Sequence, residues 1–139
     1  WLPDEVEGVA YFSFDNPAQS PRIPIYSGTI SLPSSFAICG QHRYRPEAAS
    51  WAFRETNRIA TINWEKTRKI IESQAIHFED VMFKDAPVNE QIVINLVKEG
   101  KNQEAKEYLT KYTADFASAT IRRWQELKSE LWTIFARSM

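Results

Sequence analysis

Three groups of side chains in this chain have types and spacings that could serve chemistry. The first is Cys39, which is followed directly by Gly40 and, three positions along, by His42. A cysteine nucleophile needs a base at hydrogen-bond distance and donors for the oxyanion, and neighbouring positions in a sequence supply neither. We therefore expect the chain's only cysteine to be a small buried hydrophobic residue without a catalytic role.

The second group, His77, Glu79 and Asp80, consists of residue types that bind metal ions. On a helix these positions point in different directions, except for the pair His77 and Asp80, and no third ligand is in view. The single cysteine also excludes a site built from several thiolates. We expect a solvated surface here, with no metal ion and no other cofactor.

The third group, Asp15 and Asn16, lies among turn-forming residues, so a turn is its first interpretation and a site only its second. The basic run 41–45 places an aromatic residue between cationic ones, a pattern that can bind a phosphate chain. A surface segment leading into a helix is the simpler explanation for this run. Four tryptophans at helical spacing are expected in the core, not in a ligand box: Trp51, Trp64, Trp124 and Trp132.

The composition is that of one folded domain, with 139 residues, 43% of them hydrophobic and 25% charged. The 17 basic and 18 acidic residues nearly cancel and are spread along the chain. Neither nucleic acid nor an anionic membrane surface is therefore an expected partner. No apolar run approaches the ~20 residues that span a bilayer. These features leave the cellular compartment open.

The chain changes character near position 40, and residues 1–40 are expected to form a β-strand and loop segment that contributes to a sheet. Residues 9–14 predict a strand that is apolar on both faces and needs a layer on each side. Residues 22–27 predict a second strand, in which Pro24 requires an edge or a bulge. Two strands alone are only marginally stable, so we expect further strands outside this chain.

Residues 41–139 predict a helical layer that forms one domain, or a fragment of one, with the front part. The first helix is expected to start after Pro46 and to run to about Phe83. A short helix is then expected with its cap and a first-turn proline in residues 85–87, closed by Gly100, before a long one that begins at Asn102. The fold class is α+β, mostly α, with two long antiparallel helices. The last helix carries the clearest apolar stripe: Ala105, Tyr108, Leu109, Tyr112, Phe116, Ala119, Trp124, Leu127, Leu131 and Phe135.

Several stretches, in order along nearly the whole chain, resemble the C-terminal third of the secernin-like cysteine dipeptidases. The resemblance implies a fragment of the αββα sandwich of the N-terminal-nucleophile hydrolases, whose cysteine attacks while its own α-amino group acts as base. Trp1 is not such a residue, and Cys39 is internal, so no catalytic residue is carried over to this chain. The stretches that resemble the family are residues 14–17, 23–28, 45–54, 108–113 and 124–127.

The expected function is therefore that of the C-terminal portion of a dipeptidase whose nucleophile lies outside this chain. The resemblance limits the places for substrate contact to Asp15, Asn16 and Arg22. The expected partners are the N-terminal part of the same enzyme, a dipeptide substrate and, through the unfinished sheet, a second copy of the chain. The alternative is a non-enzymatic helical module whose exposed stripe binds a partner helix.

Overall fold

The structure, a computed structural model, describes residues 5–138, so Trp1 lies outside the described part of the chain. The described residues are mostly helical with a small sheet, as the sequence predicts. No helix in this range is both long and apolar enough to cross a membrane. The elements are β1 (Val9–Phe12), β2 (Ile23–Tyr26), the 3₁₀ turns η1 (Ser34–Phe36) and η2 (Thr61–Asn63), α1 (Ala49–Ala60), α2 (Trp64–Lys98) and α3 (Asn102–Ser138).

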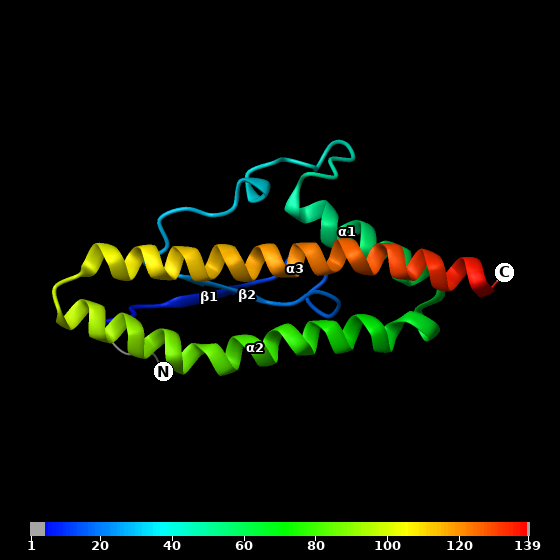
Figure 1. The fold of residues 1–139 in the computed structure, drawn as a ribbon. Coiled ribbons are helices and arrows are strands. Elements are labelled where there is room, and N and C mark those ends of the chain that lie inside the picture. The colour runs from blue at the N-terminus through cyan, green and yellow to red at the C-terminus, as the bar shows by residue number, and fades with distance from the viewer. Residues whose placement is uncertain (1–4, 139) are drawn as a thin grey trace.

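Helices α2 and α3 form a long antiparallel pair, and α1 lies along the C-terminal half of α3 (Figure 1). The predicted stripe of α3 faces inward, where Trp124, Leu127 and Leu131 are fully buried. Such a stripe buries one side of a helix because its members recur at three- and four-residue steps. Their largest core cluster also takes residues from α1 and α2: Ala52, Phe53, Ile59, Ala60 and Ile71.

The turn between the long helices is closed by Gly100, as predicted. Gly100 has a φ of +76°, a conformation that glycine adopts without steric cost. The Gly100 N–H donates to the Val97 carbonyl and the Lys101 N–H donates to the Leu96 carbonyl. These are the two hydrogen bonds of a Schellman motif, which satisfies the last carbonyls of α2.

The predicted break between the first two helices is wrong, because α2 continues through Pro87 and the chain breaks instead at residues 61–63. The Asn63 side chain accepts a hydrogen bond from the Lys66 N–H and so caps the start of α2. Proline inside a helix removes one backbone hydrogen bond and costs ~3 kcal/mol or more. Tertiary contacts on both sides of Pro87 offset this cost, because Asp85 and Asn89 accept hydrogen bonds from tyrosines of α3.

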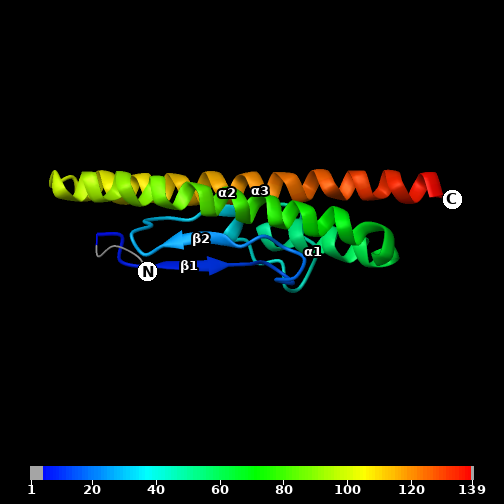
Figure 2. The same ribbon diagram turned by 90° about the horizontal axis from the view of Figure 1, so that it is seen from below.

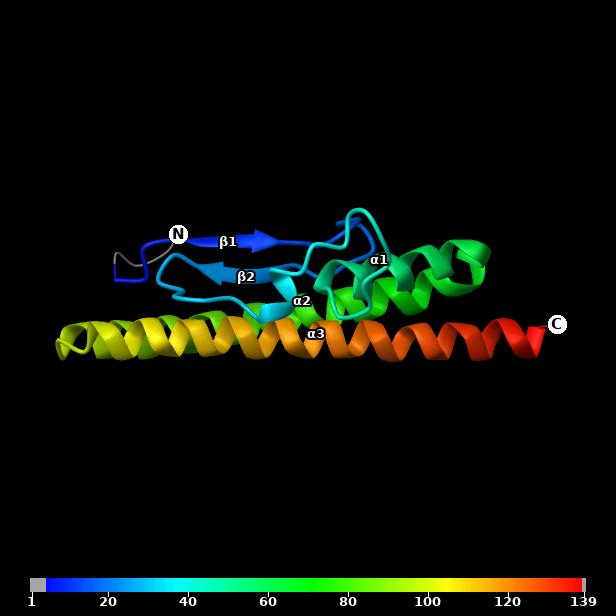
Figure 3. The same ribbon diagram turned by 90° about the horizontal axis from the view of Figure 1, so that it is seen from above.

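The two strands pair antiparallel, with Val9 opposite Tyr26 and Tyr11 opposite Pro24. Strand β2 is mostly buried and lies between β1 and the helix pair (Figures 2 and 3). The Pro24 carbonyl accepts a hydrogen bond of 2.9 Å from the Thr113 hydroxyl of α3. In the described residues both strands are sheet edges, which agrees with the position expected for Pro24.

Strand β1 differs from its prediction in length and in surroundings. It ends at Phe12, and Phe14 leaves the strand to stack on Phe53 of α1 at 5.4 Å between ring centroids. Val9 packs against the core cluster that contains Tyr26, but Tyr11 is 50% and Phe12 44% exposed, so the described residues leave most of β1 uncovered. The predicted apolar strand is thus present, but the layers that it was expected to need are not among residues 5–138.

Candidate functional site

The side chain of Asn57 joins the Asp15 turn to two helices. Asn57 lies in α1 and is buried. Its amide nitrogen donates to Asp15 Oδ2 at 3.1 Å and to Ser20 Oγ at 2.8 Å, and its oxygen accepts from Trp124 Nε1 at 3.0 Å. Burying an amide without partners is costly, so this arrangement fixes the turn in one position.

Asp15 adopts a φ of +57°, a left-handed conformation that aspartate tolerates better than most residues. Its carboxylate is held by Asn57 on one oxygen, while Arg54 Nε lies 3.9 Å from the other. The Asp15 side chain is 17% exposed. Both carboxylate oxygens therefore have a partner, and the side chain stays partly accessible.

Asn16 continues the turn that the sequence predicts. Its side-chain oxygen accepts a hydrogen bond of 2.9 Å from the Ala18 N–H, and its amide nitrogen donates to Gln19 Oε1 at 3.1 Å. Such an Asx turn fixes both the backbone and the side chain. The turn and α1 enclose a polar pocket of about 230 Å³ lined by Asp15, Asn16, Gln19, Asn57, Arg58 and Thr61.

Arg22 is not part of this pocket. Its guanidinium forms an ion pair of 3.0 Å with Glu79 of α2, and it lines a second pocket, of about 250 Å³, with Pro17 and Ala18. The two pockets share no lining residue. The structure therefore brings Asp15 and Asn16 together and separates Arg22 from them.

The expectation that Cys39 is buried is wrong, because it is exposed on the loop between η1 and α1. The buried residue at this place is Gly40, whose carbonyl accepts a hydrogen bond of 2.7 Å from Trp51 Nε1. In the basic run that follows, Tyr44 packs edge-on against Trp51 and donates to Glu55. The run is the surface segment leading into a helix that we expected.

His77 and Asp80 are exposed, and Glu79 pairs with Arg22. Across residues 5–138, no three histidine, cysteine, aspartate or glutamate side chains lie close enough together to hold a metal ion. Of the four tryptophans, Trp124 is a core residue, and Trp64 packs against the same cluster. Trp132 is 52% exposed, so its expected place in the core is wrong.

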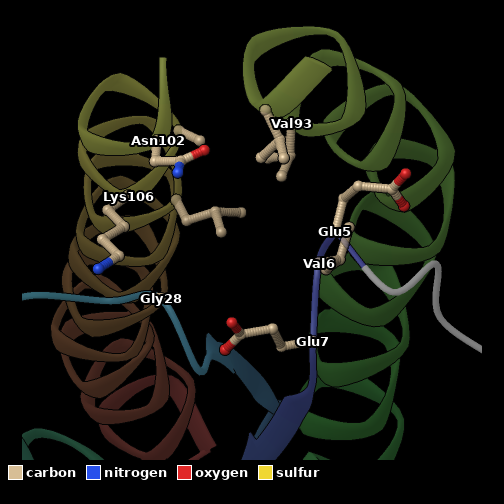
Figure 4. A pocket seen from close by; sticks show the side chains of 10 residues that line it. Glu5, Val6, Glu7, Gly28, Val93, Asn102 and Lys106 are labelled. Carbon is tan, nitrogen blue, oxygen red and sulfur yellow. The ribbon is translucent and has the colours of Figure 1, made fainter. Parts of the chain in front are cut away.

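The sequence reasoning missed Asn57 and a further pocket at the turn between α2 and α3 (Figure 4). The sequence does mark Asn57 as unusual, since it is an amide within the apolar pattern of α1. Comparison of the chain with protein-family models, with curated proteins and with solved structures found no match.

Proposed function

We propose that this chain is the C-terminal part of a secernin-like cysteine dipeptidase, whose nucleophilic cysteine lies in another part of the enzyme. The observation that supports the proposal is the exposure of strand β1. Its outer edge has no neighbouring strand among the described residues, and Tyr11 and Phe12, which alternate between its two faces, are exposed. A strand of this composition is typical of the interior of a larger sheet with layers on both sides.

The chain's only cysteine does not supply a nucleophile in this proposal. Cys39 is exposed on a loop, and it is internal, so it has no free α-amino group to act as its base. The N-terminal part of the same enzyme would provide both the catalytic cysteine and the strands next to β1. The role of this chain is then to support the sheet and to contribute to substrate contact.

The pocket beside Asp15 supports a contact with a dipeptide. A dipeptide carries an ammonium and a carboxylate group, and the residues that line the pocket include Asp15 and Arg58, whose charges are opposite to these. The Asn16 side chain is held at the same pocket by its own turn. Arg22 remains a proposed substrate contact only through the neighbouring pocket, where Glu79 already neutralises it.

The product of the complete gene tests the proposal. We expect its mature form to begin with cysteine and to release free amino acids from dipeptides. Replacing that cysteine with alanine should abolish turnover, whereas Cys39→Ser should leave it unchanged. A reading frame that encodes no such cysteine, or turnover that is lost in Cys39→Ser, would contradict the proposal.

A second candidate function is a helical module that binds another protein. The observation that favours it is the pair Ile76 and Phe83, which are 57% and 61% exposed and lie seven residues apart on α2. Residues at this spacing share one helix face and can serve as anchors for a partner helix. If the complete protein keeps its dipeptidase activity when it carries both Ile76→Glu and Phe83→Glu, this face of α2 takes no part in catalysis. A complete gene product without dipeptidase activity would favour this second function.

A further inference from the structure

The end of the molecule at the turn between α2 and α3 holds a pocket of about 320 Å³. Its walls come from residues 5–7, from Gly28 beyond β2, and from the facing ends of both long helices (Figure 4). Ligand pockets span about 300–1,000 Å³, so this one suits a small molecule. It shares no lining residue with the pocket beside Asp15.

The deep part of this pocket is apolar. Val6, Val93, Ala105 and Leu109 line it, and all four belong to one buried core cluster. Val93 and Val6 come from different segments and lie on the same side of the opening in Figure 4. Only 1–4% of each of these residues is exposed, so together they form an apolar floor that a ligand's carbon skeleton can contact.

One charged group points toward the opening. In Figure 4 the Glu7 carboxylate extends into the space beside Gly28, whereas the Glu5 carboxylate and the Lys106 amine turn away. Glu7 has a φ of +64°, and its carboxylate accepts a hydrogen bond of 3.3 Å from the Ser27 hydroxyl. The same hydroxyl accepts a hydrogen bond of 3.1 Å from the Gly8 N–H.

Glu7 is thus a positioned carboxylate at the mouth of an apolar pocket. It makes no ion pair with any residue in the described range 5–138. A positively charged ligand group would complement this charge, and an apolar body would fill the space behind it. The Asn102 amide on the opposite wall offers both a donor and an acceptor to any further polar substituent.

We propose that this pocket binds a small ligand with a primary ammonium group on an apolar carbon skeleton. The ammonium group contacts Glu7, and the carbon skeleton lies on Val6, Val93 and Leu109. Free amines, apolar amino acids and the N-termini of peptides all present this chemistry. The proposal concerns binding alone and stands whether or not the chain belongs to a dipeptidase.

The test is a titration of the ¹⁵N-labelled chain with isopentylamine, followed by NMR. We expect saturable shifts at the amides of Gly28, Ala105 and Leu109, and weaker binding of isopentanol, which keeps the skeleton but lacks the charge. Glu7→Gln should weaken isopentylamine binding by about two- to five-fold, as for an exposed charge pair. Ser27→Ala should weaken it in the same direction, while Glu65→Gln, at an exposed carboxylate in the first turn of α2 that does not line the pocket, is the matched control and should change nothing.

Two further probes distinguish the sources of the ligand. Tighter binding of L-leucinamide than of L-leucine would indicate a peptide N-terminus, and the reverse would indicate a free amino acid. The proposal is overturned if isopentylamine produces no saturable shift at the pocket. It is equally overturned if isopentanol binds as well as the amine, or if Glu65→Gln weakens binding as much as Glu7→Gln.

Discussion

The indole of Trp51 lies so close to Gly40 that only glycine fits at that position. Trp51 Nε1 donates to the Gly40 carbonyl, and a Cβ atom on residue 40 would collide with the Trp51 ring. The loop before α1 is held to the helix by this contact. The exposed Cys39 therefore lies next to a backbone position that the contact between Gly40 and Trp51 fixes.

Gly40→Ala should lower the free energy of unfolding by about 1–3 kcal/mol, because the added methyl group forces the indole or the loop to move. Gly8→Ala is the matched control, since a Cβ atom there would meet nothing within 4 Å. Urea denaturation followed by tryptophan fluorescence measures both. Equal midpoints for the two variants would show that the loop adapts to the methyl group without strain.

Leu127→Ala should cost about 2–5 kcal/mol through lost burial and the remaining cavity. Leu127 is fully buried on the stripe of α3, whereas Leu32, with the same side chain, is 44% exposed. Leu32→Ala should therefore have a much smaller effect. Thermal unfolding of both variants checks the difference, and a similar loss in both would place the stripe outside the core.

Asn57→Ala should destabilise the protein by about 1–3 kcal/mol, because it leaves the buried indole N–H of Trp124 without its partner. Asn95→Ala is the control, since Asn95 is exposed and its side chain accepts a hydrogen bond from the neighbouring Gln91 on the helix surface. Urea titrations measure the two losses. A loss for Asn57→Ala no larger than that for Asn95→Ala would argue against its role in fixing the Asp15 turn.

Alkaline pH should destabilise the fold through Tyr112. Burial, and then a hydrogen bond of 3.0 Å donated to Asp85, raise the pKa of Tyr112 above its ordinary value. In the unfolded chain a tyrosine loses its proton near pH ~10, whereas the folded protein keeps this one at higher pH. The contribution of Tyr112 is therefore complete below pH ~10 and decreases as the pH rises beyond it.

Urea unfolding from pH 8 upward in Tyr112→Phe measures this contribution. We expect a shallower loss of stability above pH ~10 in the variant than in the unchanged protein. Tyr11→Phe, which alters a half-exposed ring, should follow the unchanged protein. Identical pH profiles for all three proteins would show that Tyr112 ionises alike in the folded and unfolded states.

The chain on its own should self-associate through β1, because a free strand edge with apolar side chains is a template for another strand. A symmetric pair is the simplest product. Phe12→Glu should reduce the association in sedimentation experiments at micromolar concentration. Phe83→Glu makes the same change at an exposed site on α2 and should not. If every sample sediments as a monomer, the exposed edge and side chains of β1 do not cause association.

The sequence predicts the long helical pair well because its apolar period repeats many times along α3. From Leu109 to Leu131 each member of the stripe supports the same face, so a single exception does not alter the prediction. The break between the first two helices, in contrast, was predicted from a single residue, and the local preference of that residue did not determine the structure. Pro87 signals a helix start in the sequence, but hydrogen bonds from the tyrosines of α3 keep it inside α2.

The candidate site could be predicted only in part. The Asp15 turn follows from local chemistry, which neighbouring residues determine. Its connection to the core depends on Asn57, whose partners Ser20 and Trp124 lie 37 and 67 positions away. No periodic pattern in a sequence indicates contacts between residues so far apart in the chain. For the same reason the sequence did not show that Arg22 and Asp15 line different pockets.

The hydrogen bond between Thr113 and the Pro24 carbonyl also bears on the order of events during synthesis. It joins residues 89 positions apart, and the core partners of α1 lie still later, at Trp124, Leu127 and Leu131. Contacts of such long sequence separation form slowly, because a long loop must close first. On the ribosome, β1 and β2 can pair early, but β2 and α1 remain without α3 until most of that helix has emerged, and during that interval a chaperone has access to the face of β2 that is later buried.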